Sequence, residues 1–202
     1  LAERHSRSPQ ALAWLGKWHV LRAVQGLSTD VVGDAQKAIQ YAQRALDTGA
    51  SSTLALTLSG HVLGFLKKDL GAAQEYLELS LSQNPNEPLT WIYLAALRAW
   101  QGRGNEAVQA SHRALELSPL DPMRYYYDTL AAFAEMTAGN HQAAKELASR
   151  SLRAHRLHLS THRTLAISQW HLGEHDNARR TVQDLMVIDP EFTVRKYRDR
   201  FP

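Results

Sequence analysis

The clearest pattern of apolar and polar positions in this chain lies between residues 88 and 121. Three apolar residues recur there at spacings of three and four, on one face of a helix: Trp91, Leu94 and Ala95. Gly102 is expected to end this helix, because glycine adopts a positive φ at no steric cost. A second helix should open at Gly104 or Asn105 and close before Pro119. Its buried stripe is predicted to hold Ala107, Ser111, Ala114 and Leu115.

The same arrangement recurs along the chain with a period of about 34 residues. Four pairs of like residues are 34 apart: Pro85 and Pro119, Ala73 and Ala107, Gly139 and Gly173, Ala144 and Ala178. A fixed period of this size indicates one supersecondary unit stacked on copies of itself. The sequence therefore predicts an all-α fold of about five helix-turn-helix repeats in a single array. The expected repeats are 10–50, 52–86, 88–121, 122–157 and 159–192, followed by a polar capping helix in 191–202.

Three of these repeats depart from the regular spacing. The repeat 122–157 follows a connection lengthened by three residues. In 52–86, one extra residue precedes the interior turn before Asp69. In 10–50, the interior turn is expected to be swollen by about ten residues around positions 26–30, as end units of such arrays often are. Trp14 and Trp91 are assigned to the core.

Composition narrows the class of protein. The 202 residues are 44% apolar, which suffices for a continuous core, and they include no cysteine. A chain without cysteine has no disulfide or thiolate metal site and fits a reducing compartment, so we expect a cytoplasmic location. The net charge of +3 is too small an excess to predict a nucleic-acid partner for this domain. No run approaches the roughly 18 apolar residues of a membrane span, and the start at Leu1 suggests a piece of a longer protein.

The repeat at 88–121 resembles the tetratricopeptide (TPR) pattern W-x2-L-G-x2-Y…A-x3-F…A…P. The corresponding residues here are Trp91, Leu94, Ala95, Arg98, Ala107, Ser111, Ala114 and Pro119. The resemblance implies a right-handed superhelical solenoid whose first helices line an inner groove. It also implies a non-catalytic module that binds a protein or peptide partner and needs no cofactor.

Several segments resemble a narrower bacterial family of C-terminal TPR domains. They are 13–15, 59–62, 81–91 (LSQNPNEPLTW), 117–128 (LSPLDPMRYYYD), 151–158 (SLRAHRLH) and 165–170 (LAISQW). In that family the repeats follow a class III adenylate/guanylate cyclase domain or a winged-helix DNA-binding domain. The resemblance implies a regulatory module of a bacterial signalling protein whose N-terminal effector lies outside this chain.

The inner groove of such an array predicts a set of partner contacts. The residues expected to face it are His61, Phe65, Ala96, Trp100, Phe133, Met136, Ile167 and Trp170. The aromatic residues and Met136 would give an apolar lining suited to an amphipathic helix, although aromatic residues at helical spacing also commonly pack in a core. His61 and Arg163 would be polar contacts in this lining. A clamp for a C-terminal carboxylate is not expected, because its usual Lys, Asn and Arg positions hold Thr57, His61, Ala96 and Phe133.

Ten histidines raise the question of a metal site or a pH sensor. His158 and His162 are four residues apart, which can present two imidazoles on one helix face. No acidic or thiol third ligand accompanies them, so no metal site is predicted. His171 and His175 have the same spacing but straddle Gly173, so they should not share a helix. Sensing of pH by several histidines stays open.

The most basic segment combines Arg150, Arg153, Arg156 and Arg163 with His155, His158 and His162. It can meet an anionic partner, such as a phosphate or an acidic domain, or it can be a solvated outer face. Aromatic residues do not interleave with these arginines, so the segment does not favour binding of single-stranded nucleic acid.

No enzyme class is indicated, since the chain has no phosphate loop, nucleophile elbow or dinucleotide fingerprint. Asp30 with Asp34, or Asp121 with Asp128, could form a carboxylate pair, but acids at loop edges commonly cap helices. Three functions remain. The chain binds a partner segment, or pairs two copies through the turn at 26–34 and the ends of the array, or senses a small ligand in its concavity.

Overall fold

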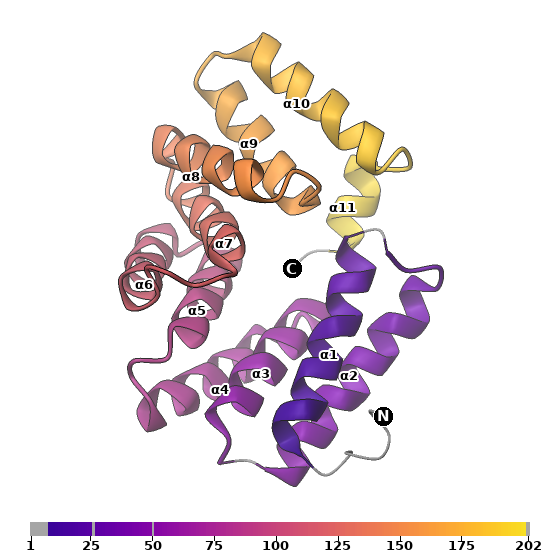
Figure 1. Cartoon of the computed structure of the whole chain (residues 1–202), viewed down its shortest axis with the longest axis vertical. Helices are drawn as coiled ribbons and strands as arrows, with labels where there is room; N and C mark the ends of the chain where they lie inside the picture. Colours follow the sequence, from indigo (N-terminus) through magenta and orange to yellow (C-terminus); the bar gives the residue numbers. More distant parts are fainter. Residues whose placement is uncertain (1–7, 26, 50, 201–202) are drawn as a thin grey trace. The chain divides into compact units, whose positions relative to one another are not determined.

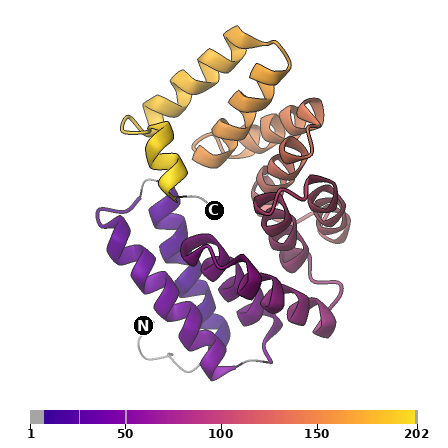
Figure 2. The same ribbon diagram turned by 180° about the vertical axis from the view of Figure 1, so that it is seen from behind.

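The computed structural model describes residues 8–25, 27–49 and 51–200, and all statements below refer to these residues. They form eleven helices and no strand, and successive helices pack as hairpin pairs (Figures 1 and 2). The helices are α1 Pro9–Val24, α2 Val31–Thr48, α3 Thr53–Lys67, α4 Leu70–Gln83, α5 Pro88–Trp100, α6 Gly104–Leu117, α7 Arg124–Thr137, α8 His141–Ala154, α9 Leu159–His171, α10 His175–Ile188 and α11 Val194–Arg200. The predicted all-α fold of about five helix pairs and a C-terminal helix is confirmed.

The chain divides into two compact units. The first runs to Thr90 and takes in the chain from Arg198, and the second is Trp91–Tyr197. Each unit is described by itself below. That the chain forms one continuous domain, with the repeat boundaries given above, stays a prediction.

Helices of the first unit begin at side-chain caps. The backbone N–H groups of Ala11, Gly33, Ala55 and Ala72 donate to Ser8, Asp30, Ser52 and Asp69. Each such cap satisfies an amide that the helix leaves without a partner and stabilises it by about 1 kcal/mol. The expectation that Asp30 caps a helix is therefore confirmed.

Glycines in left-handed conformation close the first helix of three pairs. Gly102, Gly139 and Gly173 have φ values of 73°, 83° and 78°. The prediction for Gly102 is confirmed, and α6 opens at Gly104. In the pair α3–α4 this place is taken by Lys68, whose φ is 56°. Helix α3 has 15 residues where α5 and α9 have 13, which agrees with an extra residue before that turn.

The first pair differs from what the sequence suggested. Helices α1 and α2 are 16 and 18 residues long, and the connection between them is positions 25–30. The prediction that about ten additional residues lie in the turn is wrong. Much of the additional sequence instead lengthens the two helices. The core assignment of Trp14 is also wrong, since 43% of its surface is exposed. Leu12 and Ala13 are the buried residues there.

Small residues fill the contacts between helices in the second unit. Ala107, Ser111 and Ala114 on α6 are buried as expected, and Leu115 is partly exposed. Ala107 packs with Ala99 and Ala134, which joins α5, α6 and α7. Close approach of helix backbones explains why alanine recurs at these positions.

A buried group of three hydroxyls joins α3, α4 and α5, and we call it the N-terminal hydroxyl cluster. Thr57 Oγ1 lies 2.9 Å from Ser80 Oγ and 2.6 Å from Thr90 Oγ1. Ser80 also donates to the carbonyl of Thr53, at 3.1 Å.

The C-terminal hydroxyl cluster joins α7, α8 and α9 in the same way. Thr129 Oγ1 lies 2.9 Å from Ser151 Oγ and 2.6 Å from Thr161 Oγ1. Ser151 donates to the carbonyl of Tyr125, at 2.8 Å. His158 adds a fourth member, with Nδ1 2.8 Å from Thr161 Oγ1.

Candidate functional site

An exposed strip of side chains runs along α9. Arg163, Ile167 and Trp170 follow one another at spacings of four and three, so they share one helix face. Trp170 is 52% exposed and Ile167 is 39% exposed. We call these three residues the α9 strip.

Each end of the α9 strip is held by an aromatic contact. The ring of Trp170 lies 4.3 Å from the ring of His175, centroid to centroid. The guanidinium of Arg163 lies 4.9 Å from the ring centroid of Tyr197 and donates to Ser160 Oγ at 2.8 Å. Such contacts orient both side chains while leaving the tryptophan face open to solvent.

Three more of the predicted groove residues are half-buried in the second unit. They are Trp100 on α5 and Phe133 and Met136 on α7. Phe133 packs against the cluster of Ala99, Ala107 and Ala134, so part of its ring belongs to the core. Ala96 is buried. A role of these residues in partner binding stays a prediction.

His61 and Phe65 lie on α3 in the first unit and are 5% and 6% exposed. Their rings stack, with centroids 6.1 Å apart. Burial lowers the pKa of His61 well below its usual value, and the charge of Lys17 lowers it further. Lys17 is itself buried, and desolvation lowers its pKa to about 7.

The structure separates the arginines of the basic segment into two kinds. Arg150 donates to both oxygens of the buried Asp128 at 2.7 Å, and Arg163 is held as described above. Arg153 and Arg156 are exposed, and their guanidinium groups make no hydrogen bond or ion pair with any described residue. The basic segment therefore contributes two uncommitted cations.

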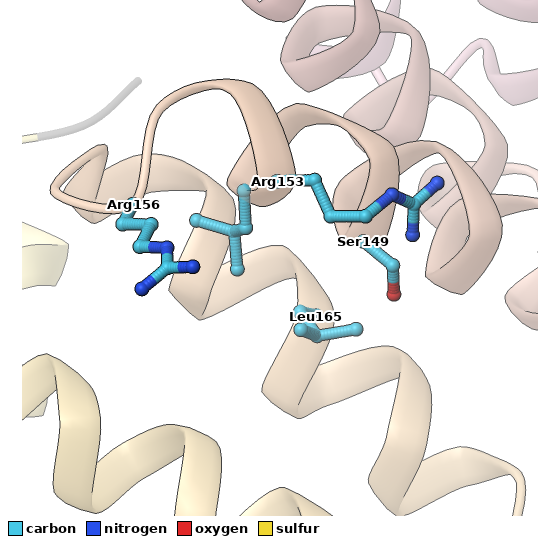
Figure 3. A pocket seen from close by; sticks show the side chains of 5 residues that line it. Ser149, Arg153, Arg156 and Leu165 are labelled. Atoms are coloured by element: carbon cyan, nitrogen blue, oxygen red, sulfur yellow. The ribbon is translucent and has the colours of Figure 1, made fainter.

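These two arginines border a hollow between α8 and α9 (Figure 3). Its volume is about 510 Å3, and it is lined by Ser149, Leu152, Arg153, Arg156 and Leu165. Figure 3 shows Arg153 and Arg156 on opposite sides of the hollow, with Leu165 reaching it from the facing helix. The leucines pack in a cluster with Ala132 and Ala148, which gives the hollow an apolar floor.

The histidines are engaged in packing and hydrogen bonding. His158 Nδ1 belongs to the C-terminal hydroxyl cluster, whereas His162 Nε2 donates to the carbonyl of Arg156 at 2.8 Å. His171 ends α9 and stacks on His141 with ring centroids 4.2 Å apart, and burial lowers the pKa of His141. Within the described part of the chain, no three His, Cys, Asp or Glu side chains are grouped to hold a metal ion.

Neither suggested carboxylate pair forms. Asp34 accepts from His19 at 2.6 Å, and hydrogen bonds from Ser28 and His19 lower its pKa. Asp128 is held by Arg124 and Arg150, while Asp121 accepts the backbone N–H of Met123. Asp121 holds a turn, whereas Asp34 and Asp128 lie inside α2 and α7 and bind side chains, so of the four acids only Asp30 caps a helix as expected. None of the described helices combines the length and the apolar character that crossing a membrane needs.

Comparisons with known proteins address the fold. No family pattern matches this chain. A stretch of 58 residues, 29% of the chain, is 41% identical to the peroxisomal targeting signal receptor of Saccharomyces cerevisiae. This match covers 10% of the receptor, so the chain spans a small part of that relative's length.

Solved structures match nearly the whole chain. PilF of Pseudomonas aeruginosa superposes with a TM-score of 0.63 and 20% identity, over 92% of this chain and 77% of PilF. MamA of Desulfovibrio magneticus RS-1 gives 0.59 and 15%, over 87% and 95% of the two chains. YrrB, described as a TPR protein with an unusual peptide-binding site, gives 0.57 and 14%, over 98% and 95%.

At these identities the likeness concerns the fold alone, and the chain has the TPR fold. The predicted fold class is confirmed in this respect. The narrower resemblance to C-terminal domains of bacterial cyclases and winged-helix regulators stays a prediction.

Proposed function

We propose that the chain is a non-catalytic interaction module that binds a peptide segment of a protein partner. The α9 strip carries the proposal, because it presents an exposed tryptophan and isoleucine on one helix face beside an arginine. Tryptophan and arginine are the residues that most often dominate binding energy at protein interfaces. The TPR fold does not fix a function by itself. YrrB, which shares the fold, is described as having an unusual peptide-binding site, and this supports a peptide as the ligand.

In this proposal the partner also contacts Phe133 and Met136 on α7, which packs against α9 in the same unit, and Trp100 on α5. Half-buried aromatic and methionine side chains give an adaptable apolar surface. His61 and Phe65 lie in the first unit and are buried, so they are not counted in this surface and the test below does not depend on them.

The resemblance to bacterial C-terminal TPR domains supports a cellular role. In this role the module regulates an N-terminal effector of a cytoplasmic signalling protein when its partner binds. A cyclase or winged-helix domain encoded N-terminal to these repeats in the same protein would support the role, and a full-length sequence with neither domain would contradict it.

Selection from a random dodecapeptide display library tests the binding function. We expect peptides that bind the wild-type chain and lose about ten-fold or more in affinity on Trp170→Ala. Trp18→Ala is the matched control, because Trp18 on α1 is also 52% exposed. Thermal unfolding should be nearly unchanged in both variants, since both rings are exposed. If every selected peptide binds Trp170→Ala as tightly as wild type, the α9 strip is not the binding surface.

Self-assembly is a second candidate, and α1 favours it. Trp14 and Trp18 lie four residues apart and are both exposed, which leaves two indole rings open on one face of the first helix. Sedimentation velocity across micromolar concentrations should show dimers that Trp14→Ala/Trp18→Ala abolishes and Trp170→Ala retains. A wild-type chain that stays monomeric throughout rules this candidate out.

A further inference from the structure

The hollow between α8 and α9 is bordered by two arginines that form no ion pair or hydrogen bond within the described chain. Every other arginine of the basic segment is committed: Arg150 to Asp128, and Arg163 to Ser160 and Tyr197. Arg153 and Arg156 have no such partner among the described residues, although both border the same hollow. An arginine without a carboxylate partner can bind one from a ligand, because a guanidinium group donates several hydrogen bonds in a fixed plane.

The TPR fold does not require arginine at these two positions. The first unit offers a direct comparison, because Ser80 and Thr90 of its hydroxyl cluster precede Ser151 and Thr161 by 71 residues. At the same offset, α4 and the residues after it hold Glu78, Ser82 and Pro85 in place of Ser149, Arg153 and Arg156. The basic character is thus specific to the second unit.

The floor of the hollow selects among anions. Leu152 and Leu165 offer apolar contacts, and Ser149 is the one uncharged polar side chain in the lining. An inorganic anion would use the arginines and make no contact with the apolar floor. A nucleic acid would find no aromatic residue in the lining on which to stack a base. A peptide with a carboxylate and an aliphatic side chain uses both parts of the site.

We infer that this hollow is a second binding site, which takes an acidic-apolar peptide segment. An Asp or Glu carboxylate of the peptide pairs with Arg153 or Arg156 at the edge of the hollow, and a leucine-sized side chain a few residues away packs on Leu152 and Leu165. The inference rests on the proposed function in one respect, namely that the ligand is a peptide. The two binding sites share no residue, because the α9 strip consists of Arg163, Ile167 and Trp170.

The dodecapeptide library serves as the probe for this site as well. Clones selected on the wild-type chain are sorted by their loss on Arg153→Glu/Arg156→Glu. We expect one group that weakens about ten-fold or more on this variant and that shares an acidic residue within four positions of Leu, Ile, Met or Phe. Arg180→Glu/Arg195→Glu is the matched control, because it makes the same change of net charge at two exposed arginines outside the hollow.

A synthetic peptide from this group then locates the contacts. Replacing either its acidic or its apolar residue with serine should weaken binding, and binding should weaken when salt is raised from 50 to 300 mM, because salt screens exposed charges. Trp170→Ala should leave this peptide bound. Thermal unfolding of Arg153→Glu/Arg156→Glu should match the wild type, since neither arginine stabilises the fold through a described contact.

Three results overturn the inference, and they are distinguishable. If wild type selects no peptide, both the proposed function and this site fail. If all selected peptides bind Arg153→Glu/Arg156→Glu normally, the function stands and the site fails. If inorganic phosphate displaces the peptide completely, and serine in place of the apolar residue has no effect, the hollow is a simple anion site.

Discussion

The two hydroxyl clusters lie in different units and can be compared atom by atom. In both, two threonine hydroxyls are 2.6 Å apart and a serine donates to the carbonyl four residues before the first threonine. The C-terminal cluster differs by one member, because His158 Nδ1 bonds to Thr161. The comparison teaches that hydroxyls alone can satisfy one another where three helices meet, as in the N-terminal cluster. In the C-terminal cluster the hydroxyls also bond to a ring nitrogen of His158.

The units differ more strongly in how they bury charge. In the second unit, buried Asp128 pairs with Arg124 and Arg150, and buried Glu135 accepts from His112 and Asn140. The first unit also buries a paired carboxylate, since Asp34 contacts His19 and Arg22, but it buries Lys17 as well, at a cost that shows as a lowered pKa. Buried carboxylates therefore have partners in both units, and the difference is the desolvated ammonium of Lys17, which opposes folding of the first.

Removing the buried ammonium should have the largest effect. The pKa of Lys17 falls from 10.5 to about 7 on folding, so between these values the unfolded chain holds a proton that the folded chain has released. Stability therefore rises with pH through this window, and burial costs on the order of 4 kcal/mol at pH 7. Lys17→Met should raise the free energy of unfolding at pH 7 by an amount of this order, and the gain should shrink towards pH 10.

Urea unfolding at pH 7 and pH 9.5 measures this effect. Lys37→Met is the control, because Lys37 on α2 is exposed and should change stability little at either pH. A Lys17→Met protein that is less stable than wild type at both pH values would show that the ammonium supports the fold.

Loss of the central hydroxyl should weaken both clusters. Ser80→Ala and Ser151→Ala each leave two buried threonine hydroxyls short of a partner, which should cost about 2 kcal/mol in the free energy of unfolding. Ser82→Ala is the matched control, because Ser82 is exposed. Chemical denaturation of the three variants tests whether the clusters are equivalent. Costs below that of Ser82→Ala would contradict a stabilising role.

Replacing all three hydroxyls of a cluster should have different effects on stability in the two clusters. Thr57→Val/Ser80→Ala/Thr90→Val removes every hydroxyl at once, so we expect it to lie within about 1 kcal/mol of wild type, which is less than the sum of its single changes. Thr129→Val/Ser151→Ala/Thr161→Val should cost about 1 kcal/mol more, because it leaves Nδ1 of buried His158 without a hydroxyl partner. Equal costs for the two triple variants would remove the distinction drawn from His158.

The turns give the smallest expected effect. No atom lies within 4 Å of a Cβ built on Gly139, so Gly139→Ala should cost about 1 kcal/mol through backbone strain alone. Lys68→Gly should instead stabilise by about 0.5 kcal/mol, because released strain exceeds the added entropy of an unfolded glycine. Gly71→Ala, in an open helical position, serves as the control and should be neutral or stabilising. Thermal unfolding resolves the signs, and a stabilising Gly139→Ala would contradict the strain argument.

Local features of the fold could be predicted from the sequence. Gly102 signals its own turn, and the spacing of Ala107 and Ala114 signals a buried helix face, because both depend on neighbouring residues only. Lys68 takes the same left-handed place without a glycine to mark it. The sequence predicts that Trp14 is buried, but it is exposed, because the face that α1 buries depends on how α2 packs against it.

Features that join distant helices could not be predicted. The hydroxyl clusters connect residues 22 to 33 positions apart, and isolated serines and threonines give no period that points to them. The basic segment could be found from its composition. Its composition does not reveal which of its arginines bind other side chains of the protein. That distinction depends on Asp128 approaching Arg150 from another helix. The roles of Trp100, Phe133, Met136, Arg163 and Trp170 stay predictions until a partner is tested.

The shared hydroxyl clusters also bear on how this sequence can evolve. Any single substitution in a cluster passes through a variant with an unsatisfied buried hydroxyl, so stepwise change is opposed even where the complete apolar replacement is tolerated. Positions such as 153 and 156 meet no such barrier, since their guanidinium groups make no hydrogen bond or ion pair with a described residue. Among homologues, the three positions of each cluster should therefore change together or not at all, while the arginine pair is gained and lost one residue at a time.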